Sequence, residues 1–177
     1  LAKDQKGDLK PDFMLLDAKE VFTSIKILAE GLAQKKPNIH FKLIQKGTVP
    51  KSLIHDERML LGITRNLLGN AFKFTEDQKN NQIKVVFEFK QQGFEITVSD
   101  TGIGIDEEYH QKIFKEFTQV EGDARRKYEG TGLGLSIVDK YAKSLNAKIT
   151  LNSKSGEGTT FVVFFPYFEE EDLKNLR

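Results

Sequence analysis

Three short motifs in this chain contain residue types that can bind a phosphorylated ligand. In the first, within residues 66–73, Asn66, Asn70 and Lys73 recur every three or four positions. At about 100° per residue, this spacing places both amides and the lysine on one stripe of a helix, beside its apolar face. Asparagine forms helices poorly, so two on one stripe indicate a ligand or a buried hydrogen-bond network. An amide oxygen suits magnesium, which a few protein groups commonly hold together with substrate phosphates and water.

The second motif, residues 100–104, reads Asp-Thr-Gly-Ile-Gly and follows a stretch of alternating apolar residues. A carboxylate at the end of a strand can accept a hydrogen bond from the exocyclic amine of a base. Glycine lets the base approach the backbone closely. Such a site would select adenine over guanine. An ordinary turn remains the alternative, because Asp and Gly dominate turns for conformational reasons.

The third motif, residues 130–134, reads Gly-Thr-Gly-Leu-Gly and precedes an expected helix. Unpaired N–H groups and the positive end of a helix dipole favour an anion here. The spacing matches neither a dinucleotide fingerprint nor a P-loop. Arg125, Arg126 and Lys127 add charge just upstream, although a basic run on a loop is often only solvated surface. Together the three motifs predict a site for a metal-bound nucleoside triphosphate.

The composition of the whole chain narrows the class of protein. The chain has 177 residues, which suits one well-cored domain, and 27 basic against 26 acidic residues give a net charge of +1. This balance gives no reason to expect nucleic acid as a partner. Cysteine is absent, which excludes disulfides and thiolate metal sites. No run approaches the roughly 18 apolar residues of a membrane span. Because the chain starts at Leu1, we expect a piece of a longer parent, with or without a membrane anchor. We expect this piece to lie in the cytoplasm.

The expected elements alternate between helices and strands. Asp17 is a plausible N-cap for a helix to about Lys35, and a second helix is expected from Glu57 to about Phe74. Further helices are expected at 107–114 and 133–145, with short strands near 13–16, 39–43 and 53–54 and hairpins formed by 83–89 with 94–98 and by 148–151 with 160–165. We expect a linker at 1–12, a domain at 13–166 and an acidic tail or linker at 167–177.

In this order the motifs resemble the catalytic ATP-binding domain of two-component sensor histidine kinases. These belong to the GHKL, or Bergerat-fold, superfamily shared with gyrase-type topoisomerases, MutL and heat-shock chaperones. Five boxes occur in family order, at 56–75, 100–104, 113–117, 130–135 and 156–159. The resemblance implies an α/β (α+β) two-layer sandwich, with a mixed, mostly antiparallel sheet on three helices and a mobile lid over ATP. It also implies ATP and Mg²⁺ as cofactors.

The resemblance assigns roles to individual residues. Asn70 becomes the magnesium ligand and Asp100 the acceptor for the adenine amine. The other nucleotide-binding residues are Asn66, Lys73, Phe74, Gly102, Gly104, Ile105, Phe117, Thr131, Gly132, Leu133, Gly134 and Thr159. Lys73, Arg126 and Lys127 are the candidate catalytic cations.

Some positions depart from the family pattern. Met59 and Gly62 stand where the family usually has Arg and Gln, and Glu129 replaces a common Gly beside the phosphate loop. Hydrolysing relatives commonly place a glutamate four residues before the magnesium asparagine, where it activates water. This chain has Asn66 there, so we expect slow intrinsic ATP hydrolysis. Residues 117–119 and 126–130 are closer to those of hybrid-type kinases.

The resemblance also predicts partners. In these kinases the acceptor histidine lies on a separate helical dimerisation domain, and no segment here matches it. We therefore expect ATP binding without autophosphorylation, a monomeric chain within a homodimeric parent, and a response regulator downstream. A regulatory module that binds nucleotide without transfer, and a GHKL-type ATPase, are the alternatives.

Overall fold

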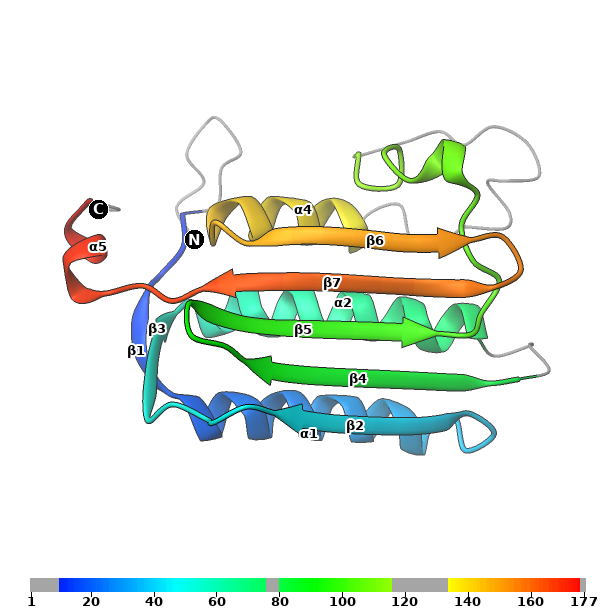
Figure 1. Ribbon diagram of the computed structural model, residues 1–177, viewed down its shortest axis with the longest axis horizontal. Coiled ribbons are helices and arrows are strands. Elements are labelled where there is room, and N and C mark those ends of the chain that lie inside the picture. Colours follow the sequence, from blue (N-terminus) through cyan, green and yellow to red (C-terminus); the bar gives the residue numbers. More distant parts are fainter. Residues whose placement is uncertain (1–9, 76–79, 116–133, 176–177) are drawn as a thin grey trace.

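A five-stranded sheet with helices packed on one face forms the body of the molecule (Figure 1). The computed structural model describes residues 10–75, 80–115 and 134–175. In sheet order the strands are β2 (His40–Lys46), β4 (Gln82–Phe89), β5 (Gly93–Asp100), β7 (Gly158–Pro166) and β6 (Lys148–Lys154). Only β2 and β4 pair in parallel in this sheet, and the other neighbours are antiparallel. The predicted fold class, a mixed and mostly antiparallel sheet on helices, is confirmed.

Three helices cover one face of this sheet, as predicted. They are α1 (Ala18–Gln34), α2 (Glu57–Thr75) and α4 (Gly134–Ser144), and α2 lies between the other two. The carboxylate of Asp17 caps α1 by accepting the N–H groups of Lys19 and Glu20, at 2.8 and 3.1 Å. This is the capping role that the sequence predicts for Asp17.

The core lies between α2 and the sheet. Leu60, Ile63 and Leu67 are at most 1% exposed and stand on the face of α2 that the three-and-four spacing predicts. Burial of each such side chain contributes roughly 1.5–3 kcal/mol. Against them, the ring of Phe94 stacks between those of Phe87 and Phe165, with centroids 5.4 and 5.0 Å apart. Packing of this buried face fixes the position of α2 on the sheet, and with it the position of Asn66, Asn70 and Lys73.

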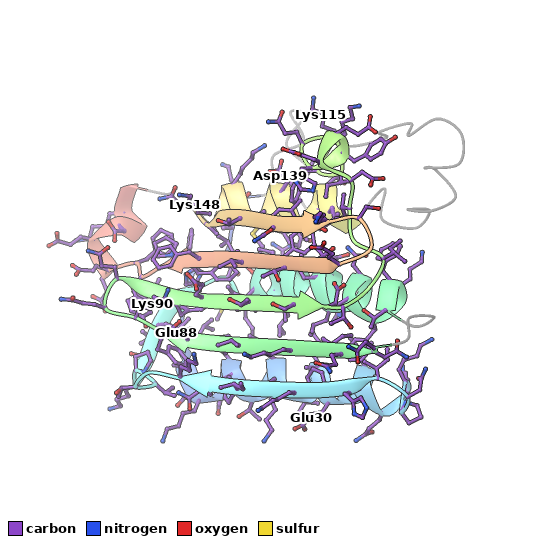
Figure 2. The ribbon with its side chains drawn as sticks, turned by 45° about the vertical axis from the view of Figure 1, so that its right-hand side comes forward. Glu30, Glu88, Lys90, Lys115, Asp139 and Lys148 are labelled. Carbon is purple, nitrogen blue, oxygen red and sulfur yellow. The ribbon has the colours of Figure 1, made fainter. Side chains whose placement is uncertain are left out.

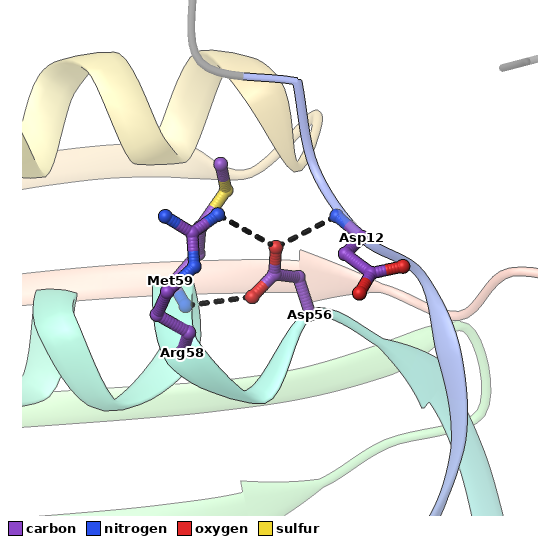
Figure 3. A network of polar contacts seen from close by, with 4 residues as sticks. All are labelled: Asp12, Asp56, Arg58 and Met59. Carbon is purple, nitrogen blue, oxygen red and sulfur yellow. Dashed lines mark hydrogen bonds and ion pairs between the residues drawn. The ribbon is translucent and has the colours of Figure 1, made fainter. Parts of the chain in front are cut away.

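Asp56 joins the N-terminal segment to the start of α2 (Figure 3). One carboxylate oxygen accepts the N–H of Met59 at 2.9 Å and so caps the helix. The other oxygen accepts the N–H of Asp12 at 2.8 Å and contacts the guanidinium of Arg58 at 3.3 Å. This buried carboxylate therefore has partners on every side, all supplied by the chain itself.

His55 ends β3 (Ser52–His55), which pairs antiparallel with β1 (Met14–Asp17). Its Nε2 lies 2.9 Å from the carbonyl oxygen of Pro166 and donates to it, because a carbonyl only accepts. The ring of Phe168 lies 5.1 Å from that of His55 and 4.7 Å from that of Phe13. Burial lowers the pKa of His55 to about 4. The first and last described strands thus meet at one neutral, buried imidazole.

One segment differs from its prediction. Residues 107–114 do not form the expected helix: only a single 3-10 turn, η1 (Glu107–Tyr109), is present. The segment opens with Glu107 and Glu108, and its aliphatic and phenylalanine side chains come only at the end, where Phe114 packs edge-on against Phe161. Within the acidic tail or linker expected at 167–177, the chain forms a short helix, α5 (Glu170–Asn175).

The face of the sheet opposite the helices carries alternating polar side chains. Figure 2 shows Glu88 and Lys90 near the turn between β4 and β5, where Lys90 contacts Glu95 at 2.9 Å and Glu88 at 3.8 Å. Exposed pairs of this kind contribute little to stability. In the described part of the chain, no helix has the length and apolar character that crossing a bilayer requires.

Candidate functional site

A cavity lies at the end of the molecule where α2 and β5 end and β7 begins. Its empty space measures about 400 Å³, including the part open to solvent. Six of the predicted site residues line it, namely Asn70, Phe74, Asp100, Gly104, Ile105 and Thr159. The structure therefore brings together residues at or beside three of the five boxes, those at 56–75, 100–104 and 156–159.

Asp100 supplies a hydrogen-bond acceptor to this cavity. It is the last residue of β5, opposite Thr159 in β7. Its carboxylate accepts the N–H of Gly102 at 2.8 Å and also the N–H of Thr159. Burial raises its pKa from 3.8 to about 6, and these two N–H groups oppose the shift. At pH 7 about nine tenths of Asp100 is thus ionised and able to accept a further donor from a ligand.

The turn after Asp100 is fixed by close backbone packing. Gly104 has φ +68°, and a Cβ there would lie 1.9 Å from the carbonyl oxygen of Lys154. Ile103 donates its N–H to the carbonyl of Phe74 at 3.2 Å and accepts the N–H of Gly156 at 2.7 Å. Only glycine satisfies both the left-handed conformation and this approach. The turn is consequently fastened between the end of α2 and the turn between β6 and β7.

The two asparagines of α2 have different surroundings. The amide nitrogen of Asn70 is buried at the cavity without a hydrogen-bond partner in the described part of the chain. The amide nitrogen of Asn66 donates to the carbonyl of Gly62 at 2.7 Å, and its oxygen faces Gly134, the first residue of α4. Lys73 is exposed, with its Nζ 5.6 Å from the centroid of the Phe74 ring.

The surroundings of Asn70 fit a magnesium ion that arrives with phosphates. The atom without a partner is the amide nitrogen, a donor, and a phosphate oxygen would complete its contacts. The amide oxygen is the hard type of ligand that Mg²⁺ takes, usually with substrate phosphates and water. No cluster of three or more His, Asp or Glu residues that could hold a metal occurs in residues 10–75, 80–115 and 134–175.

Some predicted site residues fall elsewhere. Asn66, Lys73, Gly102 and Gly134 do not line the cavity, and Gly102 orients Asp100 through its N–H. The remaining ones lie outside the described residues, namely Phe117, Arg126, Lys127, Thr131, Gly132 and Leu133.

The apolar walls of the cavity were missed by the sequence interpretation. They are Ile113, Leu135 and Phe161, which are 7%, 2% and 4% exposed. The alternation of β7 carries a signal for one of them, because Phe161 lies two residues after Thr159 and so on the same face. An apolar wall suits the faces of a purine ring.

The structure also explains one departure from the family pattern. A Cβ at Gly62 would lie 2.6 Å from the ring of Tyr141 in α4. Tyr141 thus fills the space where the family usually has a glutamine side chain at position 62. The loss of one side chain on α2 is offset by packing from α4.

Comparison with known proteins places this geometry in a family. Over residues 55–169 the chain matches the family described as "Histidine kinase-, DNA gyrase B-, and HSP90-like ATPase". The chain belongs to this family. It is 32% identical over 171 residues to hybrid signal transduction histidine kinase D of Dictyostelium discoideum, an alignment covering 94% of this chain and 11% of the relative. It is 40% identical over 111 residues to a sensor-like histidine kinase of Rhizobium meliloti, covering 63% of this chain and 21% of the relative.

A solved structure agrees. The catalytic domain of histidine kinase ThkA superposes with a TM-score of 0.69 and 26% identity, covering 88% of this chain and 95% of that one. The recognised family and the ATP-binding catalytic domain predicted from sequence are thereby confirmed. ATP binding follows from membership in this ATPase family. The chain spans only about a tenth to a fifth of the length of the two curated relatives above.

Proposed function

We propose that this domain transfers the γ-phosphate of ATP to a histidine on a separate helical dimerisation domain, in two-component signal transduction. In that step a ring nitrogen of the acceptor attacks the γ-phosphorus, a P–N bond forms, and the bond from phosphorus to the oxygen of ADP breaks. Such transfer needs mainly positioning and charge neutralisation, with little covalent chemistry from the protein. The cavity offers an acceptor for the base, apolar walls and an unpartnered amide for this purpose.

The observation that carries the proposal is Asn66. Its amide nitrogen is held by the carbonyl of Gly62 at 2.7 Å, and its oxygen faces the first residue of α4. A neutral amide cannot take a proton from water, whereas the glutamate that hydrolysing relatives commonly carry at this position can. The site thus favours holding ATP for another nucleophile over hydrolysing it.

Each site residue has a proposed role. Asn70 holds Mg²⁺, with Asn66 and Lys73 on the phosphate side, and Asp100 accepts the adenine amine. The other contacts come from Phe74, Gly102, Gly104, Ile105, Phe117, Thr131, Gly132, Leu133, Gly134 and Thr159. Lys73, Arg126 and Lys127 neutralise the charge that develops on the phosphates during transfer.

The wider setting is also a proposal. We propose domain bounds of 13–166, flanked by a linker at 1–12 and a tail or linker at 167–177. The parent would be a homodimer that passes the phosphate to a response regulator, with this domain on the cytoplasmic side, where ATP is available. The kinase names of the relatives support this setting.

The test is phosphate transfer to a separate acceptor. The chain is incubated with Mg²⁺, ATP labelled on the γ-phosphate and the parent's helical dimerisation domain. We expect acid-labile, alkali-stable label on the dimerisation domain and none on this chain. Asn70→Asp is the matched variant: it keeps the size of the side chain but sets a negative charge beside the phosphates. We expect it to abolish labelling while leaving the circular dichroism spectrum unchanged.

Each alternative has its own outcome. ATP binding without any label on the acceptor would favour a regulatory module. Rapid release of inorganic phosphate without label would favour an ATPase. Unchanged ATP affinity in Asn70→Asp would contradict the assignment of Asn70.

A further inference from the structure

Ser153, in β6, is the centre of a small hydrogen-bond network beside the cavity. Its Oγ lies 2.8 Å from each of three atoms: the backbone nitrogen of Ile105, the carbonyl oxygen of Gly158 and the Oγ1 of Thr159. Ile105 and Thr159 both line the cavity, but Ser153 does not. One hydroxyl therefore joins the turn after β5 to the start of β7 from behind the wall of the site.

The positions of the protons in this network follow from the number of donors and acceptors that each group has. A hydroxyl has one donor and two acceptor positions. The N–H of Ile105 can only donate, and the carbonyl of Gly158 can only accept. All three contacts are satisfied together only when Ser153 donates to Gly158 and Thr159 donates to Ser153. The hydroxyl of Thr159 then has no proton left for a ligand and keeps only acceptor lone pairs.

Thr159 and Asp100 consequently present the same polarity to a ligand. They are opposite each other across β5 and β7, and the N–H of Thr159 is itself used by the Asp100 carboxylate. Two acceptors side by side match an exocyclic amino group, whose N–H groups donate. They repel a carbonyl oxygen, which brings no proton. A site built to hydrogen-bond an N–H rejects an analogue that lacks it far better than a shape filter does.

We infer that Ser153 is a positioning residue that makes the site selective for 6-aminopurine nucleotides, by holding the Thr159 hydroxyl as an acceptor. This inference rests on ATP binding in the cavity lined by Asp100 and Thr159. Inosine triphosphate is the matched probe, since it carries the same ribose and triphosphate as ATP but has a carbonyl in place of the 6-amino group. The ratio of the two affinities isolates the effect from any general weakening of the site.

The experiment measures the affinities of wild type and variants for ATP and for inosine triphosphate, with Mg²⁺, by competition against a fluorescent nucleotide. We expect wild type to prefer ATP by at least about 100-fold. In Ser153→Ala the Thr159 hydroxyl can turn and donate to the carbonyl, so this preference should fall about tenfold. Thr159→Val should lower it by a similar factor, and the double variant should lower it no further. Ser153→Thr keeps a hydroxyl on the same carbon and should restore the preference.

A second hydroxyl pair offers a matched control. Thr160 donates to the Oγ of Ser99 at 3.0 Å, one residue along β7 and so on the opposite face of the sheet. Ser99→Ala should leave the preference unchanged. An equal loss of both affinities in Ser153→Ala, with the ratio preserved, would show that Ser153 only supports the wall and would overturn the inference. An unchanged ratio in Thr159→Val would overturn it as well. Failure of wild type to bind either nucleotide would overturn the ATP site itself, and the inference with it.

Discussion

Asp56 and Asp100 are two carboxylates in similar local settings with opposite surroundings. Asp56 directly follows β3 and Asp100 is the last residue of β5, and each accepts backbone N–H groups. Asp56 is 2% exposed, and its partners are two N–H groups and the guanidinium of Arg58. Asp100 also has two N–H groups but faces a cavity, and its pKa is raised to about 6.

The difference separates a structural role from a binding role. A carboxylate whose contacts are all supplied by the chain stabilises the fold, because nothing remains to be completed. A carboxylate held by N–H groups on one side, with a cavity on the other, is costly to ionise because it is partly buried. A ligand that donates a hydrogen bond to it lowers that cost. The same substitution at both positions should therefore affect different measurements.

Asp100→Asn should have the largest effect, on ATP binding. The amide can still accept the N–H of Gly102, but it loses the charge and places an N–H beside the adenine amine. We expect affinity to fall by about 100-fold or more, as measured by calorimetry. An affinity within threefold of wild type would remove the distinction between the two carboxylates.

Although Asp100→Asn should weaken ATP binding, it should raise the free energy of unfolding relative to wild type as the pH rises. The pKa of Asp100 is higher in the folded protein than its ordinary value of 3.8, so protonation favours folding. That contribution is complete below pH 3.8 and is lost as the pH rises through about 6. Relative to wild type, Asp100→Asn should thus gain on the order of 1–3 kcal/mol in free energy of unfolding between pH 4 and pH 8, as urea titrations can measure.

Asp56→Asn should affect stability without affecting binding. Its amide oxygen can still cap α2, but its nitrogen would face the N–H of Asp12 and the guanidinium of Arg58, which are both donors. We expect a loss of about 2 kcal/mol in the free energy of unfolding, again by urea titration. The affinity for ATP, measured on the folded fraction, should stay within about twofold. A large loss of affinity would mean that Asp56 transmits strain to the cavity.

A pH titration should give the smallest effect and sharpen the role of Asp100. With a pKa of about 6, the ionised fraction falls about tenfold between pH 7.5 and pH 5, and affinity for ATP should fall by a similar factor. The carboxyl pKa can be read directly by NMR and compared with the midpoint of the affinity profile. Agreement within about half a unit is expected, whereas a profile centred well below pH 5 would exclude Asp100 as the controlling group.

Folding must be followed in the same titration because His55 acts in the opposite direction. Its pKa is lowered to about 4 in the folded protein, so the stability that it contributes is full above pH 6.5 and is lost as the pH falls toward 4. Circular dichroism at each pH separates this unfolding from the loss of the Asp100 charge.

Regular elements and glycine turns were predictable from the sequence because local rules decide them. The spacing of Leu60, Ile63 and Leu67 predicts α2 and its buried face, and Asp17 predicts the start of α1. The failures arise where long-range packing decides. The sequence carries no local sign that Phe168 would lie against Phe13, since these residues meet only after both ends of the chain reach His55.

The candidate site shows the same division. The placement of Asn70 and Asp100 at one cavity was predictable, because asparagine is unusual in a helix and because Asp100 precedes a Gly-x-Gly turn at the end of a strand. The apolar wall residue Phe161 looks like any other core residue, and Ser153 acts only through atoms contributed by two other segments. Chemistry was therefore easier to predict than the residues that shape and orient it.

The position of β7 has a consequence for how the domain matures. Among the described strands this one comes last in the chain, yet it lies between β5 and β6 and contributes Thr159 to the cavity and Phe165 to the aromatic stack. On the ribosome, β5 and β6 therefore have no strand to pair with between them until residues 158–166 emerge. A ribosome-bound chain that stops before β7 should expose apolar surface to chaperones, and nucleotide can assist folding only after that strand is inserted.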